Sequence, residues 1–338
     1  MHVRIGINGM GRIGRAVLRS VVQRPDSPVE VVAVNDIAPV ATLAHLLRYD
    51  STYGRWDVPI ETDDDHLTVD GHLVRVLDHS RPEDVDWRAL GVDVVVEATG
   101  RFRIRERVGA HLAHGGARKV VLTAPGEVDV TVVLGVNDDE YSPHDHHIVS
   151  NASCTTNCAA PMVDVLHRSF GVRHGLLTTV HSYTGDQNLI DGPHRDLRRA
   201  RSAATNIVPT STGAARAITT IIPELDGRLD GVAVRVPVAD VSLVDLTVQL
   251  AEPATVGQVN RAFATAAEGH LKGILRYTSD PIVSRDVLGD PASCVLDSGL
   301  TTVTGDLVKV FGWYDNEWGY AQRTVDLVEM VARTLPGR

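Results

Sequence analysis

The sequence is poor in cysteine and in aromatic residues. It contains 3 cysteines among 338 residues, and Phe, Trp and Tyr together make up 4%. Three unevenly spaced cysteines do not form a disulfide framework, so their number favours a reducing compartment. The chain also lacks a run of about eighteen apolar residues and a charged N-terminal segment followed by an apolar stretch. We therefore expect a cytoplasmic protein without a membrane anchor.

Dense positive charge is absent as well. The chain has 33 Lys and Arg against 43 Asp and Glu, a net charge of -10, and no long basic block. This argues against a general polyanion-binding surface, so we expect no nucleic-acid partner and only small, locally held phosphates. The 43% hydrophobic and 22% charged residues are typical of a soluble globular chain, here long enough for two domains.

The first part of the chain alternates apolar strands with helices. The strand "VRIGI" is followed by a predicted helix over residues 12–23, the strand "VEVVAVND" and a helix over 40–47. The strands "VDVVVEATG", "KVVLTAP" and "VTVVLGVN" continue the pattern, with a helix that ends near Gly115. Strands without polar alternation are buried on both faces, and helical crossovers make them parallel. This predicts an α/β, Rossmann-type doubly wound parallel sheet, with a small antiparallel hairpin inserted at "HLTVDGHLVRVLD".

The pattern changes after about residue 150. Longer strands with alternating apolar and polar positions, such as "GVAVRVPV" and "VSLVDLTVQLAE", predict an α+β domain with a mostly antiparallel sheet covered on one face by helices. A last helix over about residues 319–335 is ended by Pro336 and Gly337, and it places four apolar residues on one face. These four are Val325, Val328, Val331 and Ala332. We expect one domain over 1–152, to which a C-terminal helix over 317–338 returns, and a second domain over 153–316.

A glycine motif lies between the first strand and the first helix. Gly9, Gly11 and Gly14 form G-x-G-x-x-G, and Asp36 ends the next strand, 22 residues after Gly14. In this context glycines allow a dinucleotide pyrophosphate to approach the helix N-terminus, and the acid accepts hydrogen bonds from the ribose. The alternative is that the glycines only end a strand and Asp36 caps a turn. A carboxylate there repels a 2'-phosphate, so the sequence favours NAD over NADP.

The segment "SNASCTTNCAAP" places Cys154 in the first turn of a predicted helix. The positive end of a helix dipole favours a thiolate, and Ser153 and Thr155 add hydroxyl donors. A cysteine such as Cys154, taken alone, is more often a buried structural residue than a nucleophile, and the structural role is the one that we expect for Cys158 and Cys294. His181 follows the strand "GLLTTV", at a strand end where ligands commonly bind, so it could pair with the thiolate.

Arginines gather in two places that fit anions. The stretch "RDLRRARSAATNIVPTSTGAAR" combines several arginines with a "TSTG" turn that opens another predicted helix. They could be a solvated face, but beside hydroxyls and a helix N-terminus an anion site is at least as favoured. Arg235 lies in the apolar strand "GVAVRVPV", where an unpaired cation is costly and needs an anionic partner.

Together these segments resemble the phosphorylating (type I) glyceraldehyde-3-phosphate dehydrogenases over nearly the whole chain. The matching motifs are "INGMGRIGR", "VND", "YDSTYG", "VEATGRF", "SNASCTTNCAAP", "HSYTGDQ", "NIVPTSTGAA", "RVPVADVSLVDLT" and "WYDNEWGY". The resemblance implies NAD-dependent oxidative phosphorylation of D-glyceraldehyde 3-phosphate to 1,3-bisphosphoglycerate, through a cysteine thiohemiacetal and thioester, in glycolysis or gluconeogenesis. It also implies a homotetramer, an NAD-binding first domain and a catalytic second domain.

The resemblance assigns roles to residues of both domains. Cys154 would be the nucleophile and His181 the base, while Thr184 and Arg235 would hold the C3 phosphate of the substrate. The implied site for inorganic phosphate comprises Ser153, Thr155, Thr212, Gly213 and Arg198, with Arg199 as the alternative arginine. The implied cofactor contacts are Gly9, Gly11 and Gly14, Arg12 and Ile13 at the pyrophosphate, Asp36 at the adenosine ribose, Arg81 and Thr123 in the middle of the pocket, Asn316 at the nicotinamide amide and Tyr320 beside its ring.

Some features are compatible with a different member of the family or a different role. Ala159 stands where relatives often carry a larger apolar residue, which suggests a changed pocket and an additional, inhibitor-insensitive member of the family. The motifs are also compatible with an erythrose-4-phosphate dehydrogenase or with a non-catalytic NAD-binding protein. The "HDHH" run at 144–147 and the "DDD" run at 63–65 are most simply a solvated loop and a charged turn, so we predict no metal site.

Overall fold

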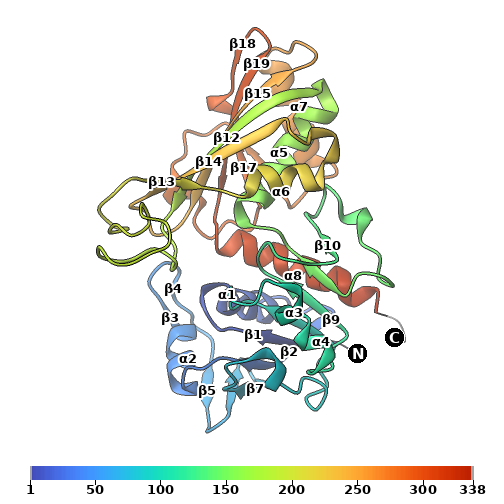
Figure 1. Cartoon of the computed structure of the whole chain (residues 1–338), viewed down its shortest axis with the longest axis vertical. Helices are drawn as coiled ribbons and strands as arrows, with labels where there is room; N and C mark the ends of the chain where they lie inside the picture. Colours follow the sequence, from blue (N-terminus) through green and yellow to red (C-terminus); the bar gives the residue numbers. More distant parts are fainter. Residues whose placement is uncertain (1, 336–338) are drawn as a thin grey trace. The chain divides into compact units, whose positions relative to one another are not determined.

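The structure is a computed structural model that describes residues 2–335, and the chain forms two compact units (Figure 1). One unit contains the chain up to Val132, Asp139–Ala152 and the segment from Ala321 onward. The other contains Val133–Asp138 and Ser153–Tyr320. No helix in the described part of the chain is long and apolar enough to cross a bilayer.

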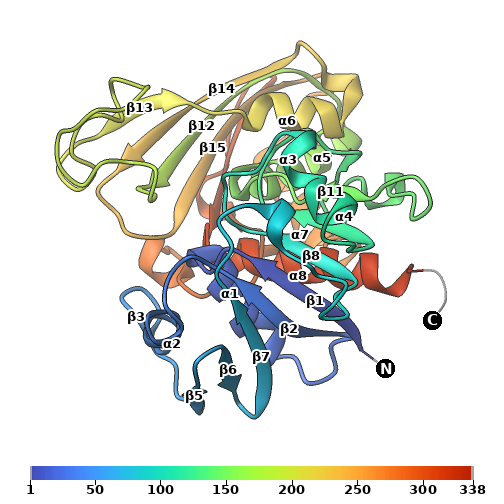
Figure 2. The ribbon, with the colours of Figure 1, turned by 60° about the horizontal axis from the view of Figure 1, so that its bottom comes forward.

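A nine-stranded sheet forms the centre of the first unit, in the order β10-β11-β9-β8-β1-β2-β7-β6-β5. Its strands are β1 (Val3–Asn8), β2 (Val29–Asn35), β5 (Ile60–Thr62), β6 (His66–Val69), β7 (His72–Leu77), β8 (Val94–Glu97), β9 (Lys119–Leu122), β10 (Val130–Thr131) and β11 (Ile148–Ser150). All neighbours from β10 to β7 pair in parallel, and β7, β6 and β5 pair antiparallel. The predicted doubly wound parallel sheet is confirmed. The predicted hairpin is β6 and β7, but it extends the main sheet, because β7 pairs with β2 (Figure 2).

The helices of the first unit follow the predicted order, but one predicted helix is divided in two and one predicted strand is shorter. They are α1 (Arg12–Val22), α2 (Val40–Arg48), α3 (Arg105–Val108), α4 (Ala110–Ala113) and the larger part of α8 (Trp318–Arg333). The single helix predicted before Gly115 is two short ones that meet at Gly109, whose added Cβ would lie 2.7 Å from Arg105 O. The strand predicted at "VTVVLGVN" stops after Thr131, because Val133 N–H donates instead to Asn137 Oδ1 at 2.8 Å in a turn.

Helix α8 buries the face that the sequence predicted. Val325, Val328, Val331 and Ala332 are at most 4% exposed. The other side of the helix receives Arg24, which follows α1 and donates to Asp326 at 2.6 Å and to Glu329 at 3.3 Å. The helix ends at Arg333, and the predicted stop at Pro336 and Gly337 lies outside the described residues.

The second unit is built on an eight-stranded sheet, in the order β13-β14-β12-β15-β19-β17-β16 with β18 beside β19. Its strands are β12 (Val172–Ser182), β13 (Val208–Ser211), β14 (Leu229–Val236), β15 (Ser242–Leu250), β16 (Leu275–Thr278), β17 (Cys294–Asp297), β18 (Thr302–Thr304) and β19 (Leu307–Tyr314). Only β12 with β14 and β16 with β17 pair in parallel, so the sheet is mostly antiparallel, as predicted.

Three helices of the second unit lie together on one side of its strands (Figure 1). They are α5 (Cys154–Phe170), α6 (Ala214–Ile221) and α7 (Val256–Glu268). Strand β15 alternates buried and partly exposed residues along its whole length, as expected for a sheet with one covered face. The remaining short elements are β3 (Tyr49–Asp50), β4 (Gly54–Arg55), η1 (Pro82–Asp84), η2 (Asp138–Glu140), η3 (Pro223–Leu225), η4 (Ser284–Val287) and η5 (Ser298–Leu300).

Helix α5 approaches the sheet most closely at Gly312 of β19. A Cβ added to Gly312 would lie 2.6 Å from Met162 Sδ, 2.7 Å from Cys294 Sγ and 3.1 Å from Cys158 Sγ. These three side chains are fully buried, which fits the packing role predicted for the two cysteines. Only glycine therefore lets α5, the helix that carries Cys154, lie against β19 in this way.

We expect Gly312→Ala to destabilise the protein, because the added methyl group meets three sulfur atoms in a packed core. Overpacking of this kind costs about 1–3 kcal/mol of unfolding free energy. Urea or thermal unfolding measures the loss. The matched control is Gly257→Ala in α7, where an added Cβ meets only the end of Arg261 at 3.4 Å and should stabilise or leave the helix unchanged. Equal stability of the Gly312→Ala variant and the parent would contradict this packing.

Candidate active site

The reactive thiol begins a helix. Cys154 is the first residue of α5, and Ser153 is its N-cap, with Oγ accepting from Thr156 N–H at 3.0 Å. His181 is the next-to-last residue of β12, and its Nε2 lies 3.5 Å from Cys154 Sγ. The parallel register of β12 and β14 pairs His181 with Arg235. Three residues that the sequence singled out are thus brought to one place.

The His181 ring is held from its other nitrogen. Nδ1 lies 2.7 Å from Ser182 O and 2.9 Å from an Arg235 guanidinium nitrogen, which also donates to Ser182 O at 2.9 Å. When Nδ1–H donates to Ser182 O, Nε2 presents its lone pair to the thiol and can accept a proton. When Nδ1 accepts from Arg235, Nε2–H points at the sulfur. The same ring can therefore act as a base or as a hydrogen-bond donor toward Cys154.

The pKa values of Cys154 and His181 are shifted in opposite directions. Burial raises the pKa of the Cys154 thiol to about 11, although the charge of Arg235 and the N–H of Thr155 act in the opposite direction. Burial and then the charge of Arg235 lower the pKa of His181 to about 3. Burial thus favours the neutral thiol and the neutral imidazole, whereas the charge of Arg235 favours the thiolate. The Thr155 N–H at the helix start favours the thiolate, as the sequence predicts, but burial has the larger effect on the pKa of Cys154.

A cluster of polar and charged side chains continues from Arg235. Its guanidinium donates to Thr184 Oγ1 at 3.2 Å, and the Thr184 hydroxyl donates to Asp186. Asp186 also accepts from Arg199, whose Nε donates to Thr210 Oγ1 at 3.0 Å. Two arginines beside a threonine hydroxyl make a site for a phosphate monoester. The sequence reasoning missed Asp186, although it lies in the quoted motif "HSYTGDQ".

The structure brings Arg199, not Arg198, to this cluster. The Arg199 side chain is 17% exposed and also lies 3.8 Å from Asp196. Arg198 is exposed, and its backbone N–H donates to Asp196 Oδ1 at 2.9 Å. Adjacent residues of this loop point in different directions, so the motif alone could not choose between them.

The residues expected at a second phosphate have different surroundings. Gly213 is the N-cap of α6, with open space where a Cβ would be, and Thr212 Oγ1 accepts from Ala214 N–H at 3.2 Å. The α6 N-terminus is thus accessible to an anion. The Thr155 hydroxyl is buried and lies 2.8 Å from the hydroxyl of Tyr314. Tyr314, which sequence reasoning missed, also packs edge-on against the His181 ring at 5.9 Å between ring centres.

Asn316 and Tyr320 follow β19 in the same unit. The Asn316 Oδ1 accepts from the hydroxyls of Ser182 at 2.9 Å and Ser242 at 2.8 Å, which fixes its amide near the end of β12. Tyr320 is 5% exposed in the first turn of α8. The Asn316 side chain is therefore held by Ser182 of β12 and by Ser242, at the start of β15.

The glycine motif of the first unit has the geometry of a dinucleotide loop. Gly9 has φ of +96°, and an added Cβ would lie 2.7 Å from Thr99 N. A Cβ on Gly14 would lie 1.9 Å from Gly9 O, so neither position accepts a side chain. Gly11 is the N-cap of α1 and makes no side-chain hydrogen bond to the start of the helix. The N–H groups at a helix start commonly bind an anionic ligand. Arg12 points its side chain to Asp50 at 2.5 Å.

A pocket with an open volume of about 560 Å³ lies beside this loop. Asp36 lies in it, with one carboxylate oxygen accepting from Met10 N–H at 2.7 Å and the other from Ala38 N–H at 3.0 Å. The lining comprises Asn8, Gly9, Asn35, Asp36, Ile37, His79, Ser80, Thr99, Arg101 and Phe102. Of the predicted cofactor residues, Gly9 and Asp36 are in this lining. Arg81 and Thr123 are outside it: Arg81 forms an ion pair with Asp84 at 2.8 Å, and the Thr123 hydroxyl donates to Glu97 O at 3.0 Å.

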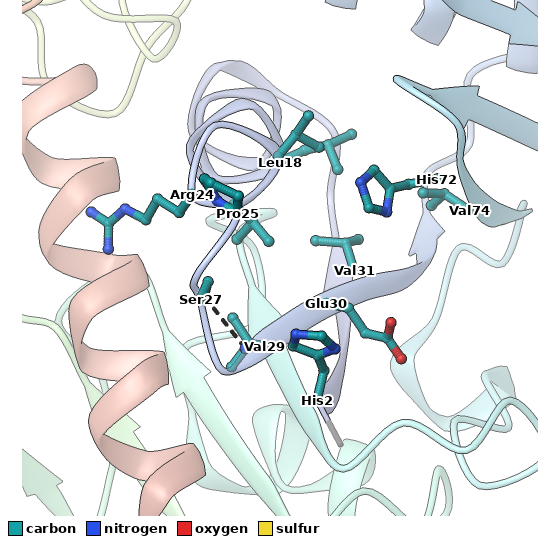
Figure 3. Close-up of a pocket in the computed structure, with 12 residues that line it drawn as sticks. His2, Leu18, Arg24, Pro25, Ser27, Val29, Glu30, Val31, His72 and Val74 are labelled. Carbon is teal, nitrogen blue, oxygen red and sulfur yellow. Dashed lines mark hydrogen bonds between the residues drawn. The ribbon is translucent and has the colours of Figure 1, made fainter.

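Another pocket of the first unit lies at the opposite ends of the strands. Figure 3 shows it between α1 and β2, with Leu18, Val29 and Val31 inside and the imidazoles of His2 and His72 at its rim. His2 precedes β1 and His72 begins β7, so this pocket is at the amino ends of the strands. Ligands of open α/β sheets bind at the carboxyl ends. The pocket that contains Asp36 is therefore the better dinucleotide site.

The carboxylates of the "DDD" run belong to a turn. Asp63 Oδ1 accepts from the N–H groups of Asp65 and His66 at 3.0 and 2.8 Å, and Asp65 forms an ion pair with Arg75. Asp63, Asp65 and His66 are close enough together to hold a metal ion, but the bonds within the turn and the neighbouring arginine already satisfy these groups. The geometry fits the predicted charged turn.

Comparison with known proteins gives full-length matches. Residues 3–105 match the family model described as "Glyceraldehyde 3-phosphate dehydrogenase, NAD binding domain", and residues 153–316 match the model of its C-terminal domain. The chain is 53% identical over 338 residues to glyceraldehyde-3-phosphate dehydrogenase of Streptomyces coelicolor, with 99% of this chain and 100% of that protein covered. It is 52% identical to the enzyme of that name from Geobacillus stearothermophilus, with 98% and 99% covered. It is 53% identical to that of Mycobacterium avium, with 99% and 100% covered.

We expect Arg235→Gln to slow alkylation of Cys154 by iodoacetamide at neutral pH. The guanidinium stabilises the thiolate and disfavours the imidazolium, so its loss raises the pKa of Cys154 further and also raises that of His181. Each unit by which the thiol pKa rises lowers the thiolate fraction about tenfold. The pH dependence of the alkylation rate measures the shift. Arg173→Gln, which removes an exposed cation from β12, the strand that carries His181, is the control. An unchanged or faster rate in Arg235→Gln would contradict this charge arrangement.

Proposed function

The chain belongs to the glyceraldehyde 3-phosphate dehydrogenase family, and from this premise we propose the chemistry of its site. It is an NAD-dependent oxidoreductase that converts D-glyceraldehyde 3-phosphate and inorganic phosphate to 1,3-bisphosphoglycerate, a step of glycolysis and gluconeogenesis. The observation that carries the mechanism is the 3.5 Å contact between Cys154 Sγ and His181 Nε2, beside the cluster of Thr184 and Arg235. Because the full-length relatives carry this enzyme's name, neither erythrose-4-phosphate dehydrogenase nor a non-catalytic protein is favoured.

The first step requires a proton transfer. In the tautomer with Nδ1–H bonded to Ser182 O, Nε2 takes the thiol proton as the sulfur attacks the aldehyde carbon. The Nε2–H formed in this way then stabilises the hemithioacetal oxygen, together with the Cys154 N–H. Burial disfavours the thiolate, and the charge of Arg235 stabilises the negative sulfur when it forms.

The second half of the reaction uses the same imidazole. Nε2–H first gives its proton to the hemithioacetal oxygen. Nε2 then takes this hydroxyl proton back while a hydride leaves the carbon, which gives a thioester on Cys154. NAD supplies the hydride acceptor when bound. Inorganic phosphate then attacks the thioester, the acyl phosphate leaves, and the cysteine thiolate is released.

Two anion sites support a reaction in which both the substrate and the second nucleophile are phosphates. We assign the C3 phosphate to Thr184 and Arg235, whose hydroxyl oxygen and guanidinium nitrogen lie 3.2 Å apart. Inorganic phosphate is assigned to Ser153, Thr212 and Gly213, with Arg199 in place of Arg198 because of its position beside Thr210 and Asp186. The buried Thr155 hydroxyl supports a different role for that residue, in which its N–H stabilises the Cys154 sulfur.

NAD is the cofactor of this family, and the first unit fits it. The backbone cradle at Gly9, Gly11 and Gly14 excludes side chains, and the N–H groups of Arg12 and Ile13 are assigned to the pyrophosphate. Asp36 is assigned to the adenosine ribose, where its charge disfavours NADP. The family resemblance further assigns Arg81 and Thr123 to the middle of the cofactor, Asn316 to the nicotinamide amide and Tyr320 to the nicotinamide ring.

The domain roles follow from these assignments. We propose that residues 1–152, with the helix over 317–338, bind NAD and that 153–316 form the catalytic domain. The segment between β12 and β13 exposes large apolar side chains, including Leu189 at 77%, Leu197 at 82% and Ile207 at 70%. Such exposure supports burial against another copy, in a homotetramer. The three free thiols support a cytoplasmic location.

We expect the enzyme to reduce NAD in the presence of glyceraldehyde 3-phosphate only when phosphate or arsenate is also present. Cys154→Ser should abolish this activity and leave NAD binding intact, because the serine hydroxyl is a much weaker nucleophile at neutral pH. Absorbance of NADH measures the rate, and calorimetry measures NAD binding. Turnover that is independent of phosphate and arsenate would refute the phosphorylating reaction, and an active Cys154→Ser variant would refute the nucleophile.

The two adjacent arginines provide a matched pair of variants. Arg199→Gln should raise the KM for phosphate about tenfold or more, because a charge-assisted hydrogen bond contributes about 1.5–3 kcal/mol. Arg198→Gln should leave the KM nearly unchanged, since that side chain is exposed. Initial rates as a function of phosphate concentration decide between them. The opposite pattern would restore Arg198 as the phosphate ligand.

A further inference from the structure

A polar network inside the first unit has no role in the mechanism described above. Glu97, the last residue of β8, is completely buried, as are His111 and Trp87. Asn8 and Asn35, at the carboxyl ends of β1 and β2, are 1% and 4% exposed. A buried carboxylate is costly unless donors surround it, so the hydrogen bonds of Glu97 decide its charge state.

The Glu97 carboxylate accepts four hydrogen bonds. Its Oε2 accepts from Asn8 Nδ2 at 2.6 Å and lies 3.0 Å from His111 Nε2. Its Oε1 accepts from Thr99 N–H at 2.8 Å and from the Thr99 hydroxyl. Thr99 belongs to the turn that follows β8 and lines the dinucleotide pocket.

The protons of this network can be assigned. The indole Nε1–H of Trp87 is a donor only, and it lies 2.9 Å from His111 Nδ1. Nδ1 therefore carries no proton, which places the proton of the imidazole on Nε2, where it points to Glu97. Four donors then converge on one carboxyl group, and only an ionised glutamate accepts all four.

Glu97 also fixes the orientation of two amide side chains at the rim of the pocket. Because Asn8 Nδ2 faces Glu97, Asn8 Oδ1 accepts from Asn35 Nδ2 at 2.7 Å. Asn35 then uses Oδ1 to accept from His79 N–H and Nδ2 to donate to His79 O, both at 2.9 Å. Asn8, Asn35, His79 and Thr99 all line the pocket that contains Asp36. One buried charge thus fixes two amides and the backbone on two sides of the pocket.

The glycine loop depends on the same turn. The Thr99 backbone that Glu97 holds is the group against which Gly9 packs, at 2.7 Å from the position of a Cβ on Gly9. The next residue, Met10, donates its N–H to the Asp36 carboxylate at 2.7 Å. A displaced turn after β8 would therefore move the loop and the acid that recognises the ribose.

We propose that Glu97 is a positioning residue for the cofactor: as a buried anion it fixes the loops that bind the adenosine half of NAD, without touching NAD itself. The proposal rests on the proposed function, because it takes NAD as the ligand of this pocket. Asn8, His111 and Trp87 support it by satisfying and orienting the carboxylate.

The nearly isosteric variant Glu97→Gln tests the charge rather than the size. Its amide either turns an NH₂ group toward the donors of His111 and Asn8 or turns it toward the two donors of Thr99. In both orientations donors face each other, so we expect the Kd for NAD to rise about tenfold or more. Calorimetry of the full-length enzyme with NAD measures the Kd. The KM for NAD should rise similarly, while the alkylation rate of Cys154 by iodoacetamide stays at the parent value.

Two comparisons separate positioning from general destabilisation. Glu106→Gln removes an exposed carboxylate of α3 and should bind NAD as the parent does. In a Trp87→Phe background His111 can move its proton to Nδ1 and accept from the new amide through Nε2. The effect of Glu97→Gln on the Kd for NAD should therefore be smaller there than in the parent.

The outcomes are distinguishable. A Glu97→Gln variant that melts at a lower temperature but binds NAD within twofold of the parent would overturn the positioning role. Equal effects of Glu97→Gln in both backgrounds would overturn the proton assignment on which the argument depends. Failure of the parent enzyme to bind NAD would instead refute the proposed function.

Discussion

The active site depends on the parallel pairing of β12 with β14. In a sheet that is otherwise mostly antiparallel, this pairing sets His181 directly beside Arg235. The guanidinium then reaches the far nitrogen of the imidazole, while the near nitrogen faces Cys154. Thr184 and Asp186, just beyond the end of β12, come within reach of the same cation. One strand register therefore positions the proposed proton acceptor beside the proposed site of the substrate phosphate.

The electrostatics of both units follow one rule, although the residues differ. Near Cys154, burial favours the neutral forms of the thiol and the imidazole, whereas the cation of Arg235 favours the thiolate. The Glu97 carboxylate can instead be buried because four hydrogen-bond donors surround it. A group that must change its protonation state is left with few hydrogen bonds, whereas a group that must stay fixed has all of them satisfied.

Much of this architecture could be predicted from the sequence, because it depends on local signals. The glycine motif, the buried strands and the helix after Ser153 are all readable from residue order, and the family resemblance is confirmed. Properties that depend on tertiary structure could not be predicted. The choice between Arg198 and Arg199 depends on the path of a loop, and the pKa of Cys154 depends on burial that no motif encodes. The role inferred for Glu97 needed a proton assignment through Trp87, which lies ten residues away in the chain.

The close packing at Gly312 has a consequence for how this enzyme can change. Behind the reactive sulfur, the helix that starts at the nucleophile packs two of its sulfur-containing side chains, together with Cys294, against this glycine. A shift of α5, and with it of the Cys154 sulfur, would therefore require the buried side chains around Gly312 to repack. Moving Cys154 to accommodate a bulkier aldehyde would need substitutions among these core residues as well as in the pocket. The position of the thiol can therefore evolve only together with the packing of the core.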